Sequence, residues 1–405
     1  MVTSWRTAPG DALITHPITG LSVRQSFAPH WAGEVVRLRL SNRYSSVPLT
    51  LENVHLALEA EAGGAAMVPG SACPLTFDGG RRITLAAGET AVSDPIHFPV
   101  RPFQRVGVSF FAPEVTLQIT RHLNANEHLY ISIPGDHAAD ATGAAFLQVP
   151  DGYASNFLAI EALEVAAPRA VRTLVAVGDS ITDGSGSAIA IPDGTPAAMT
   201  ATDQRYPNHL QRRLLTAGLP LTVANAGIGG NELLGPGLLP QFGRGLIDRF
   251  DADVLSVTGA THVLVMIGTN DSGNALPGQV PSAEAMIAGY TQLIERAHEA
   301  GLKIILGTIP PAEGTVIDGL PVVGRLGLPI GIMHGTAEAR QSRDAINAWI
   351  RAQTLSDGIV DFDACLEDPL RPGYLAPEYN SGDNLHPNPA GYRAMADCVD
   401  LDLLR

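Results

Sequence analysis

Cysteine is scarce in this sequence. Only Cys73, Cys365 and Cys398 occur among 405 residues, and none of them forms a Cys-x-x-Cys pair. A zinc site built on thiolates is therefore not expected, and at most one intramolecular disulfide is possible. The sequence predicts three buried free thiols and no resident metal.

Positive charge is also in short supply. Lys and Arg number 26 against 41 Asp and Glu, which gives a formal net charge of -15. Because such a chain repels polyanions, neither nucleic acid nor an anionic membrane surface is an expected partner. A neutral small molecule or a carbohydrate meets no such repulsion. The oligomeric state is left open.

Long apolar runs are missing as well. No run has the length of a membrane span, and the segment 1–6 lacks the apolar stretch of a secretory signal. Two locations stay open, the cytoplasm or a secreted or periplasmic site after removal of a signal peptide. With 17% charged and 45% hydrophobic residues, the chain is expected to fold into two or three domains.

The segment 1–165 is predicted to be a β-sandwich accessory domain resembling a jelly roll. Short apolar segments alternate with turn-forming Pro, Gly, Asn and Asp residues, as is typical of sandwiches. The expected strands lie at 36–40, 49–51, 83–85, 106–110 and 115–119. Pro168 and the small residues before it mark the expected boundary to the next domain.

The segment 166–405 is predicted to be a doubly wound α/β domain with a parallel sheet. Its apolar runs are of the kind that parallel strands bury on both faces. They lie at 174–177, 221–224, 262–267 and 304–306. The clearest helix begins after Ser282 as N-cap and ends at Gly301.

Four short motifs carry chemistry, and three of them follow predicted strands directly. These three are Gly178-Asp179-Ser180-Ile181-Thr182, the stretch 225–231 and Gly268-Thr269-Asn270-Asp271, and the fourth is Asp383-Asn384-Leu385-His386-Pro387. Ligands bind at the carboxyl ends of parallel strands, so we expect the first three motifs to meet at one edge of the sheet.

Together the motifs supply the parts of a serine acyl-transfer site. Ser180 is the candidate nucleophile, and Asp383 can orient His386 as its base. The backbone N–H groups of Ser180 and Gly230 and the side-chain amide of Asn270 are candidate oxyanion donors. Each residue also has a plainer interpretation taken singly: a helix cap for the serine, a turn for the glycine and an Asx-turn for the asparagine.

The order of these motifs resembles that of the SGNH (GDSL) hydrolase family, over roughly 171–400. The family's Ser, Gly, Asn and His fall at Ser180, Gly230, Asn270 and His386, with Asp383 in its Asp-x-x-His arrangement. Ile181 replaces the usual leucine. The resemblance implies a flavodoxin-like three-layer domain. The longer motif forms are similar to those of a bacterial subgroup of carbohydrate acetylesterase-like members, in which a β-rich domain often comes first.

Other chemistries lack their signatures. No HExxH, P-loop or EF-hand spacing occurs, so no cofactor is expected. Turn and cap roles are predicted for the acidic residues near the motifs, and core or surface positions for four further histidines. These are Asp179, Asp183 and Asp271, and His137, His209, His262 and His334. The long segments 185–206 and 310–336, the latter with apolar Ile330, Ile332 and Met333, are expected to shape the pocket.

The sequence therefore predicts a serine esterase that forms an acyl-enzyme, acting on short acyl groups such as acetyl on carbohydrates. The alternatives within ester chemistry are a broad aryl or alkyl esterase, a thioesterase or a lysophospholipase. The alternative from another class is a non-catalytic carbohydrate-binding protein.

Overall fold

The computed structural model describes residues 1–12, 18–123, 125–149, 156–187, 200–237, 239–276, 278–315 and 334–405. They divide into two compact units. The first comprises Met1–Arg172 with two short later pieces, Thr200–Asp203 and Thr222–Ala224, and the second comprises the remaining described residues. The predicted boundary at 165/166 falls between the strands β14 and β15. Ile330, Ile332 and Met333, which were predicted to line the pocket, lie outside the described residues.

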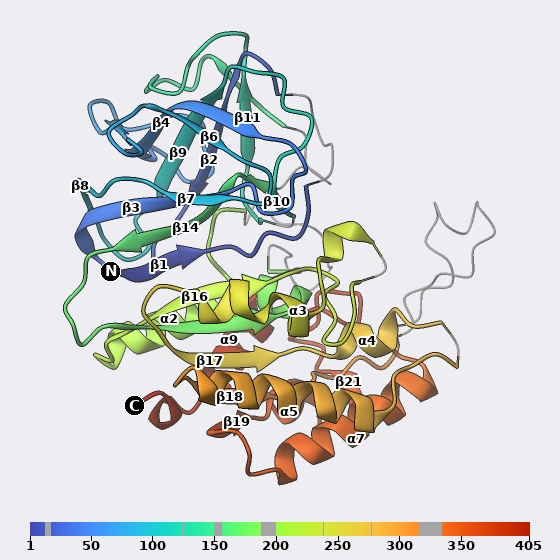
Figure 1. Ribbon diagram of the computed structural model, residues 1–405. Helices are drawn as coiled ribbons and strands as arrows, with labels where there is room; N and C mark the ends of the chain where they lie inside the picture. Colours follow the sequence, from blue (N-terminus) through green and yellow to red (C-terminus); the bar gives the residue numbers. More distant parts are fainter. Residues whose placement is uncertain are drawn as a thin grey trace. The chain divides into compact units, whose positions relative to one another are not determined.

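The described residues of the first unit form a β-rich domain of two larger sheets and a separate two-stranded sheet, β10-β13 (Figure 1). One sheet has the order β1-β14-β3-β7, with β8 also paired to β3, and the other has the order β12-β11-β2-β9-β4-β5, with β6 paired to β4. The strands are β1 Val2–Arg6, β2 Leu21–Phe27, β3 Gly33–Ser41, β4 Leu49–Leu58, β5 Cys73–Pro74, β6 Arg82–Leu85, β7 Thr90–Val92, β8 Ile96–Val100, β9 Val106–Ala112, β10 Arg121–Leu123, β11 Leu129–Ser132, β12 Phe146–Gln148, β13 Asn156–Leu158 and β14 Ile160–Val165.

Alternation of apolar and polar residues explains this packing. In β3, Val36, Leu38 and Leu40 are fully buried, as the period of two requires of a strand with one face on a core. Trp5 of β1 stacks on Phe27 of the other sheet with ring centroids 3.9 Å apart. These contacts confirm the β-rich domain, and its jelly-roll connectivity stays a prediction.

The prediction of a strand at 115–119 is wrong. The structure has only an isolated bridge between Thr116 and Ile18 there, and Val115 and Leu117 are exposed. Their alternation mimics a strand, but these two apolar side chains do not face the core, so no ladder extends along them.

The second unit is built on a five-stranded sheet with the order β16-β15-β17-β18-β19. This is the flavodoxin-like order, with its switch point between β15 and β17. Strands β15, β17, β18 and β19 pair in parallel, which confirms the predicted parallel sheet. The strands are β15 Arg172–Gly178, β16 Leu221–Gly227, β17 Ala260–Met266, β18 Lys303–Gly307 and β19 Gly358–Val360, with a separate hairpin of β20 Glu367–Asp368 and β21 Arg371–Leu375.

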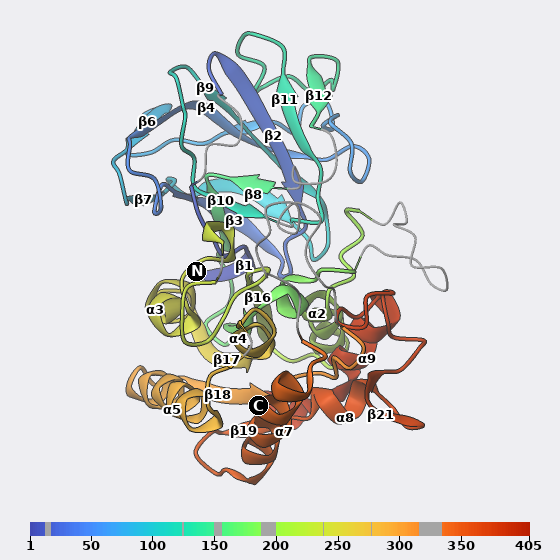
Figure 2. The same cartoon turned by 90° about the vertical axis from the view of Figure 1, so that its right-hand side faces the viewer.

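Helices cover both faces of this sheet, α3 and α5 on one and α2 and α9 on the other (Figure 2). The α-helices are α1 Ser180–Asp183, α2 Tyr206–Thr216, α3 Leu246–Phe250, α4 Thr269–Gly273, α5 Ala283–Glu299, α7 Ala337–Ala352, α8 Phe362–Leu366 and α9 Pro389–Cys398. The 3₁₀-helices are η1 Pro240–Phe242 and η3 Leu401–Leu404, and η2 Asp251–Leu255 is a π-helical segment. The predicted limits of α5 are confirmed, since Ser282 accepts from the N–H of Ala285 and Gly301 has φ +74°.

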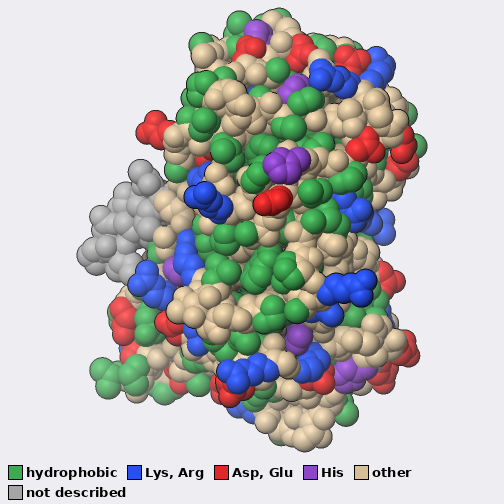
Figure 3. Space-filling view, turned by 90° about the vertical axis from the view of Figure 1, so that its left-hand side faces the viewer, with side chains coloured by type: hydrophobic (Ala, Val, Ile, Leu, Met, Phe, Trp, Pro, Cys, Tyr) green, Lys and Arg blue, Asp and Glu red, His purple; other side chains and the backbone are tan. Residues whose placement is uncertain are grey.

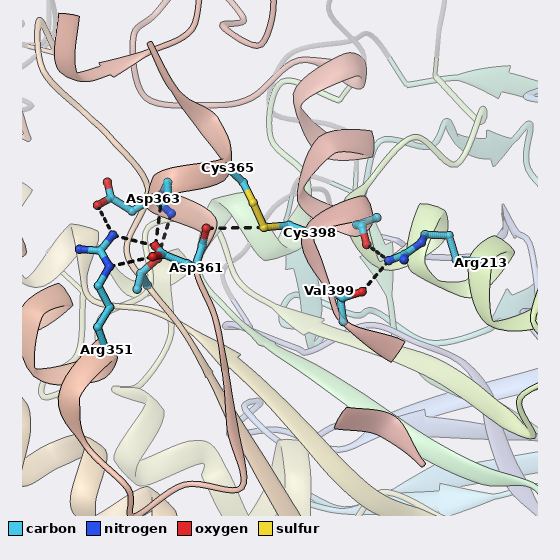
Figure 4. The surroundings of a disulfide bond; sticks show 10 residues. Arg213, Arg351, Asp361, Asp363, Cys365, Cys398 and Val399 are labelled. Atoms are coloured by element: carbon cyan, nitrogen blue, oxygen red, sulfur yellow. Dashed lines mark hydrogen bonds and ion pairs between the residues drawn. A yellow bond between two sulfur atoms is a disulfide. The ribbon is translucent and has the colours of Figure 1, made fainter. Parts of the chain in front are cut away.

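Two of the three cysteines are bonded, which corrects the prediction of three free thiols. Cys365 of α8 and Cys398 of α9 form a disulfide with their Cα atoms 6.4 Å apart (Figure 4). The packing of α8 against α9 brings the two residues within the Cα separation that a bridge requires. Their 33-residue spacing gives no local sign of this contact. Cys73 is free and half-buried.

The bridged helices are also held by charged groups. Asp361, the N-cap of α8, receives two hydrogen bonds from Arg351 at 2.7 and 2.8 Å, and Arg351 also pairs with Asp363 (Figure 4). Beyond the end of α9, Arg213 donates to the carbonyl of Val399 at 2.8 Å. This end of the unit is therefore fixed by a covalent bond and by ion pairs.

Charges of both signs are interspersed over the face shown in Figure 3. That face offers no extended basic surface of the kind that polyanions bind. Among the described residues, no helix combines the length and the apolar content needed to cross a bilayer.

Candidate active site

Ser180 stands at the junction between the first strand of the α/β sheet and a one-turn helix. The apolar strand β15 ends at Gly178, and α1 begins at Ser180 with Asp179 as its N-cap. Asp179 Oδ1 accepts from the N–H of Ile181 at 2.9 Å. Because Ser180 is the first helical residue, its own N–H has no partner within the helix and points outward. From the sequence, Ser180 was either a helix cap or a nucleophile. The structure gives the cap position to Asp179, so Ser180 is not the helix cap.

Three predicted site residues form one hydrogen-bonded chain. Ser180 Oγ lies 2.8 Å from His386 Nε2, and His386 Nδ1 lies 2.6 Å from Asp383 Oδ2. Asp383 can only accept, so Nδ1 carries the proton and Nε2 is left to accept from the serine hydroxyl. The arrangement can move the serine proton to the imidazole.

The surroundings of Asp383 keep its carboxylate ionised. Burial opposes its charge, but hydrogen bonds from the ring and the backbone N–H of His386 and from the N–H of Leu385 hold its pKa well below the usual range. Its other oxygen also accepts from Ser381 Oγ at 3.1 Å. The loop then runs into α9, where Asn388 is the N-cap and accepts from the backbone N–H groups of Ala390 and Gly391.

Gly230 occupies the turn after β16. Its φ is +74°, and a Cβ there would lie 2.3 Å from the ring of Phe242, so both backbone and space require glycine. Its N–H has no acceptor among the described residues, whereas the N–H of neighbouring Gly229 donates to Asp183 Oδ2 at 3.2 Å. The turn thus presents one unpaired donor.

Asn270 lies in α4, just beyond the end of β17, and is buried. Its amide nitrogen donates to the carbonyl of Asn231 at 2.9 Å, next to Gly230 in the chain. Its oxygen lies 3.0 Å from His334 Nε2. The Asn270 amide nitrogen carries two N–H groups, and one of them donates to Asn231. The second N–H is therefore left to bind a substrate oxygen.

Sequence reasoning missed His334, which it placed in the core or on the surface. The side chain is buried, but its bond to Asn270 brings it to the site. The other three histidines have no contact with the predicted site residues: His137 pairs with Asp140, His262 lies beside Thr261, and His209 is buried in α2.

Arg249 was missed as well, although it ties the strand ends together. This fully buried side chain donates to the carbonyls of Gly178 and Ala226, each at 2.9 Å, and to Asn231 Oδ1 at 2.9 Å. Asp253 balances its charge at 2.9 Å. An arginine can serve four acceptors because it carries five N–H donors in a fixed plane. Arg249 lies 18 residues beyond Asn231 in the chain, and no sequence motif there indicates that the two residues interact.

The acidic residues near the motifs have the predicted structural roles. Asp179 caps α1, Asp183 accepts from Gly229, and Asp271 accepts from the N–H groups of Leu233 and Leu234 at 2.8 and 3.0 Å. In the part of the chain that the structure describes, no three His, Cys, Asp or Glu residues lie together as a metal site would require.

Burial makes Asp179 hard to ionise. It raises the pKa of Asp179 to about 7, partly offset by the N–H of Ile181 and by His386. Burial likewise raises the pKa of Asp271 to about 6 and of Glu232 to about 7. Each of these acids holds its proton to higher pH in the folded than in the unfolded chain, so the contribution of these three groups to the free energy of unfolding falls as pH rises from about 4 to about 7.

We therefore expect Asp179→Asn to stabilise the protein at alkaline but not at acidic pH. The amide keeps an oxygen for the N–H of Ile181 and removes the charge that must otherwise be buried above pH 7. Thermal melts at about pH 5 and about pH 8 test this. An equal change in melting temperature at both pH values would contradict it, because a packing effect does not titrate.

Comparison with known proteins adds the following. A family model described as GDSL-like lipase/acylhydrolase matches residues 176–394 of this chain. An acetylxylan esterase from Geobacillus stearothermophilus is similar in structure, at 24% identity, with 57% of this chain and 94% of that chain covered and a TM-score of 0.38. A GDSL-like lipase from Bacteroides thetaiotaomicron is 19% identical, with coverages of 57% and 88% and a TM-score of 0.37. No curated protein matches this chain.

Proposed function

We propose that this chain, which belongs to the GDSL-like lipase/acylhydrolase family and hydrolyses ester bonds, does so through an acyl-enzyme on Ser180. The observation that carries the proposal is the continuous chain from Ser180 Oγ to His386 Nε2 at 2.8 Å and from His386 Nδ1 to Asp383 Oδ2 at 2.6 Å. A nucleophile, a base and an orienting carboxylate in this geometry are what acyl transfer through serine requires.

In the proposed reaction, Ser180 Oγ attacks the ester carbonyl carbon while its proton passes to His386 Nε2. As the tetrahedral intermediate collapses, His386 gives that proton to the leaving alcohol oxygen, and the acyl group stays on Oγ. Water then attacks the acyl carbon and gives a proton to His386, which returns it to Ser180 as the acid leaves. Asp383 holds the imidazole in one tautomer and stabilises its protonated form in both halves.

The negative oxygen of the intermediate is assigned to three donors. These are the backbone N–H groups of Ser180 and Gly230 and the remaining N–H of Asn270. Two observations support the assignment: the N–H of Gly230 has no acceptor among the described residues, and Asn270 is tied to the carbonyl of the residue after Gly230. The chain itself thus supplies nucleophile, base and donors, and we propose hydrolysis without a metal or cofactor.

The proposed substrates are short acyl esters, with acetyl groups on carbohydrates as the leading class. This finer proposal rests on the extended motif forms around Ser180 and Gly230 and on the net charge of -15, which suits a neutral substrate. The proposed catalytic groups all follow residue 172, so the β-rich first unit is assigned no catalytic group. Membership of an ester hydrolase family overturns the alternative of a non-catalytic carbohydrate-binding protein.

A panel of substrates tests the proposal. Acetylated xylose oligomers, nitrophenyl esters of rising chain length and acyl-thioesters would be assayed with Ser180→Ala as the blank. We expect the highest kcat/KM for acetyl esters and a decline as the acyl chain lengthens. Faster turnover of long-chain esters or thioesters would contradict the substrate class and leave the Ser180 mechanism standing. Equal rates for the wild type and the blank would contradict the mechanism itself.

A further inference from the structure

We propose that His334 is a positioning residue that fixes the amide of Asn270 in the one orientation that leaves an N–H for the substrate oxyanion. The inference rests on the proposed role of Asn270. His334 touches neither Ser180 nor His386 through a hydrogen bond, and it acts through Asn270 alone.

The orientation of the Asn270 amide follows from its two neighbours. The carbonyl of Asn231, 2.9 Å away, can only accept, so the amide nitrogen must face it. The amide oxygen then faces His334 at 3.0 Å, and Nε2 of that imidazole must carry the proton. A flipped amide would set two oxygens against each other and two donors against each other. Both His334 and the Asn231 carbonyl therefore oppose the flip.

The surroundings of His334 keep it a neutral donor. The side chain is 5% exposed, and its Nδ1 is buried without a partner among the described residues. An unpartnered Nδ1 is tolerable as a bare acceptor but costly as a buried donor, which favours the Nε2–H tautomer. Burial, reinforced by the charge of His386, lowers the pKa of His334 to about 3. The hydrogen bond to Asn270 is thus unchanged throughout the neutral pH range.

Close packing holds the imidazole in place. A Cβ at Gly273, one turn beyond Asn270 in α4, would lie 2.1 Å from the ring of His334. The absence of a side chain there lets the ring approach the helix and reach the amide. Asn231 is fixed from its other side, because its own side-chain oxygen accepts from Arg249 at 2.9 Å. The amide of Asn270 thus lies between two rigid partners.

The test is a pair of variants that differ by one methylene. In His334→Gln the side-chain nitrogen reaches the position of Nε2, whereas in His334→Asn it reaches only that of Nδ1. We expect His334→Gln to stay within a few fold of the wild-type kcat and His334→Asn to lose roughly 10- to 100-fold, with KM little changed in both. A merely structural histidine would not separate the two amides in this way. His262→Leu, another buried histidine lying beside Thr261, serves as a control that should keep its kcat.

The same pair in an Asn270→Ala background completes a double-mutant cycle. Asn270→Ala alone should lower kcat about 10²- to 10³-fold, as loss of one oxyanion donor does. With the amide gone, His334→Asn and His334→Gln should then give equal kcat values. Equal loss in the two amide variants with Asn270 present would overturn the role of His334. A wild-type kcat for Asn270→Ala would instead overturn the oxyanion role of Asn270, on which the inference rests.

If His334→Asn fails to fold, as its melting curve would show, His334→Gln alone still tests the role of His334. A folded His334→Gln with a 10-fold or larger loss of kcat would contradict the inference, because its amide restores the donor. Retention of kcat in His334→Gln, lost again in His334→Leu, would support it.

Discussion

Replacing Ser180 by alanine is expected to lower kcat by about 10⁶-fold, and replacing His386 by alanine by about the same factor. The serine hydroxyl is the proposed nucleophile, and a base must lie within hydrogen-bond distance to take its proton as the bond to the carbonyl forms. His386 Nε2 is that base, 2.8 Å from Ser180 Oγ. Removing either residue disables the same step. The double variant should therefore be about as slow as each single variant, because nucleophile and base act as one unit.

Single-turnover and steady-state assays on a short nitrophenyl ester would measure these losses. Ser256→Ala is the control, since that exposed serine donates to the carbonyl of Ala252 at 2.7 Å and to none of the proposed site residues. It should keep the wild-type kcat. If the double variant were much slower than both single variants, the two residues would act independently, and the proposed roles would be wrong.

Replacing Asp383 by asparagine is expected to lower kcat by about 10⁴-fold. The amide can still accept from the N–H groups of Leu385 and His386 through one oxygen, so the loop should keep its shape. Its nitrogen, however, would donate to His386 Nδ1 and so place the imidazole proton on Nε2. That nitrogen would then face Ser180 as a donor, and it could not accept the serine proton.

Steady-state kinetics with little change in KM would identify this effect as a loss in the chemical step. Asp140→Asn provides the control, because Asp140 pairs with His137 in the same three-residue spacing, at 2.8 Å, on the first unit. That substitution should leave kcat unchanged. Wild-type kinetics for Asp383→Asn would show that another carboxylate orients His386.

The sequence allowed prediction of the features that are encoded locally. The helix α5 was predictable because a serine cap, apolar residues at helical spacing and a terminal glycine all occur within one segment. The three strand-end motifs were predictable because each lies next to its own strand, and parallel strands end at one edge. The confirmed family resemblance adds the expectation that Asp383 and His386 reach Ser180 across 206 residues.

The features that escaped prediction depend on contacts between distant residues. His334 lies 64 residues from Asn270, and a lone histidine gives no sign of its partner. Arg249 binds carbonyl groups of the main chain, which every residue type provides, so no motif could point to them. The apolar residues at 115–119 show the reverse failure, since alternation alone does not guarantee a partner strand.

The disulfide has a consequence for the two residues on which the base depends. Cys365 and Cys398 enclose a covalent ring, and Asp383 and His386 both lie within it. By chain-entropy arguments a ring of this size restricts the unfolded chain enough to stabilise the fold by about 3 to 4 kcal/mol. It also means that a protease cut anywhere inside the ring would open the loop without releasing a fragment. The two halves would stay joined until a thiol reductant reached the bridge.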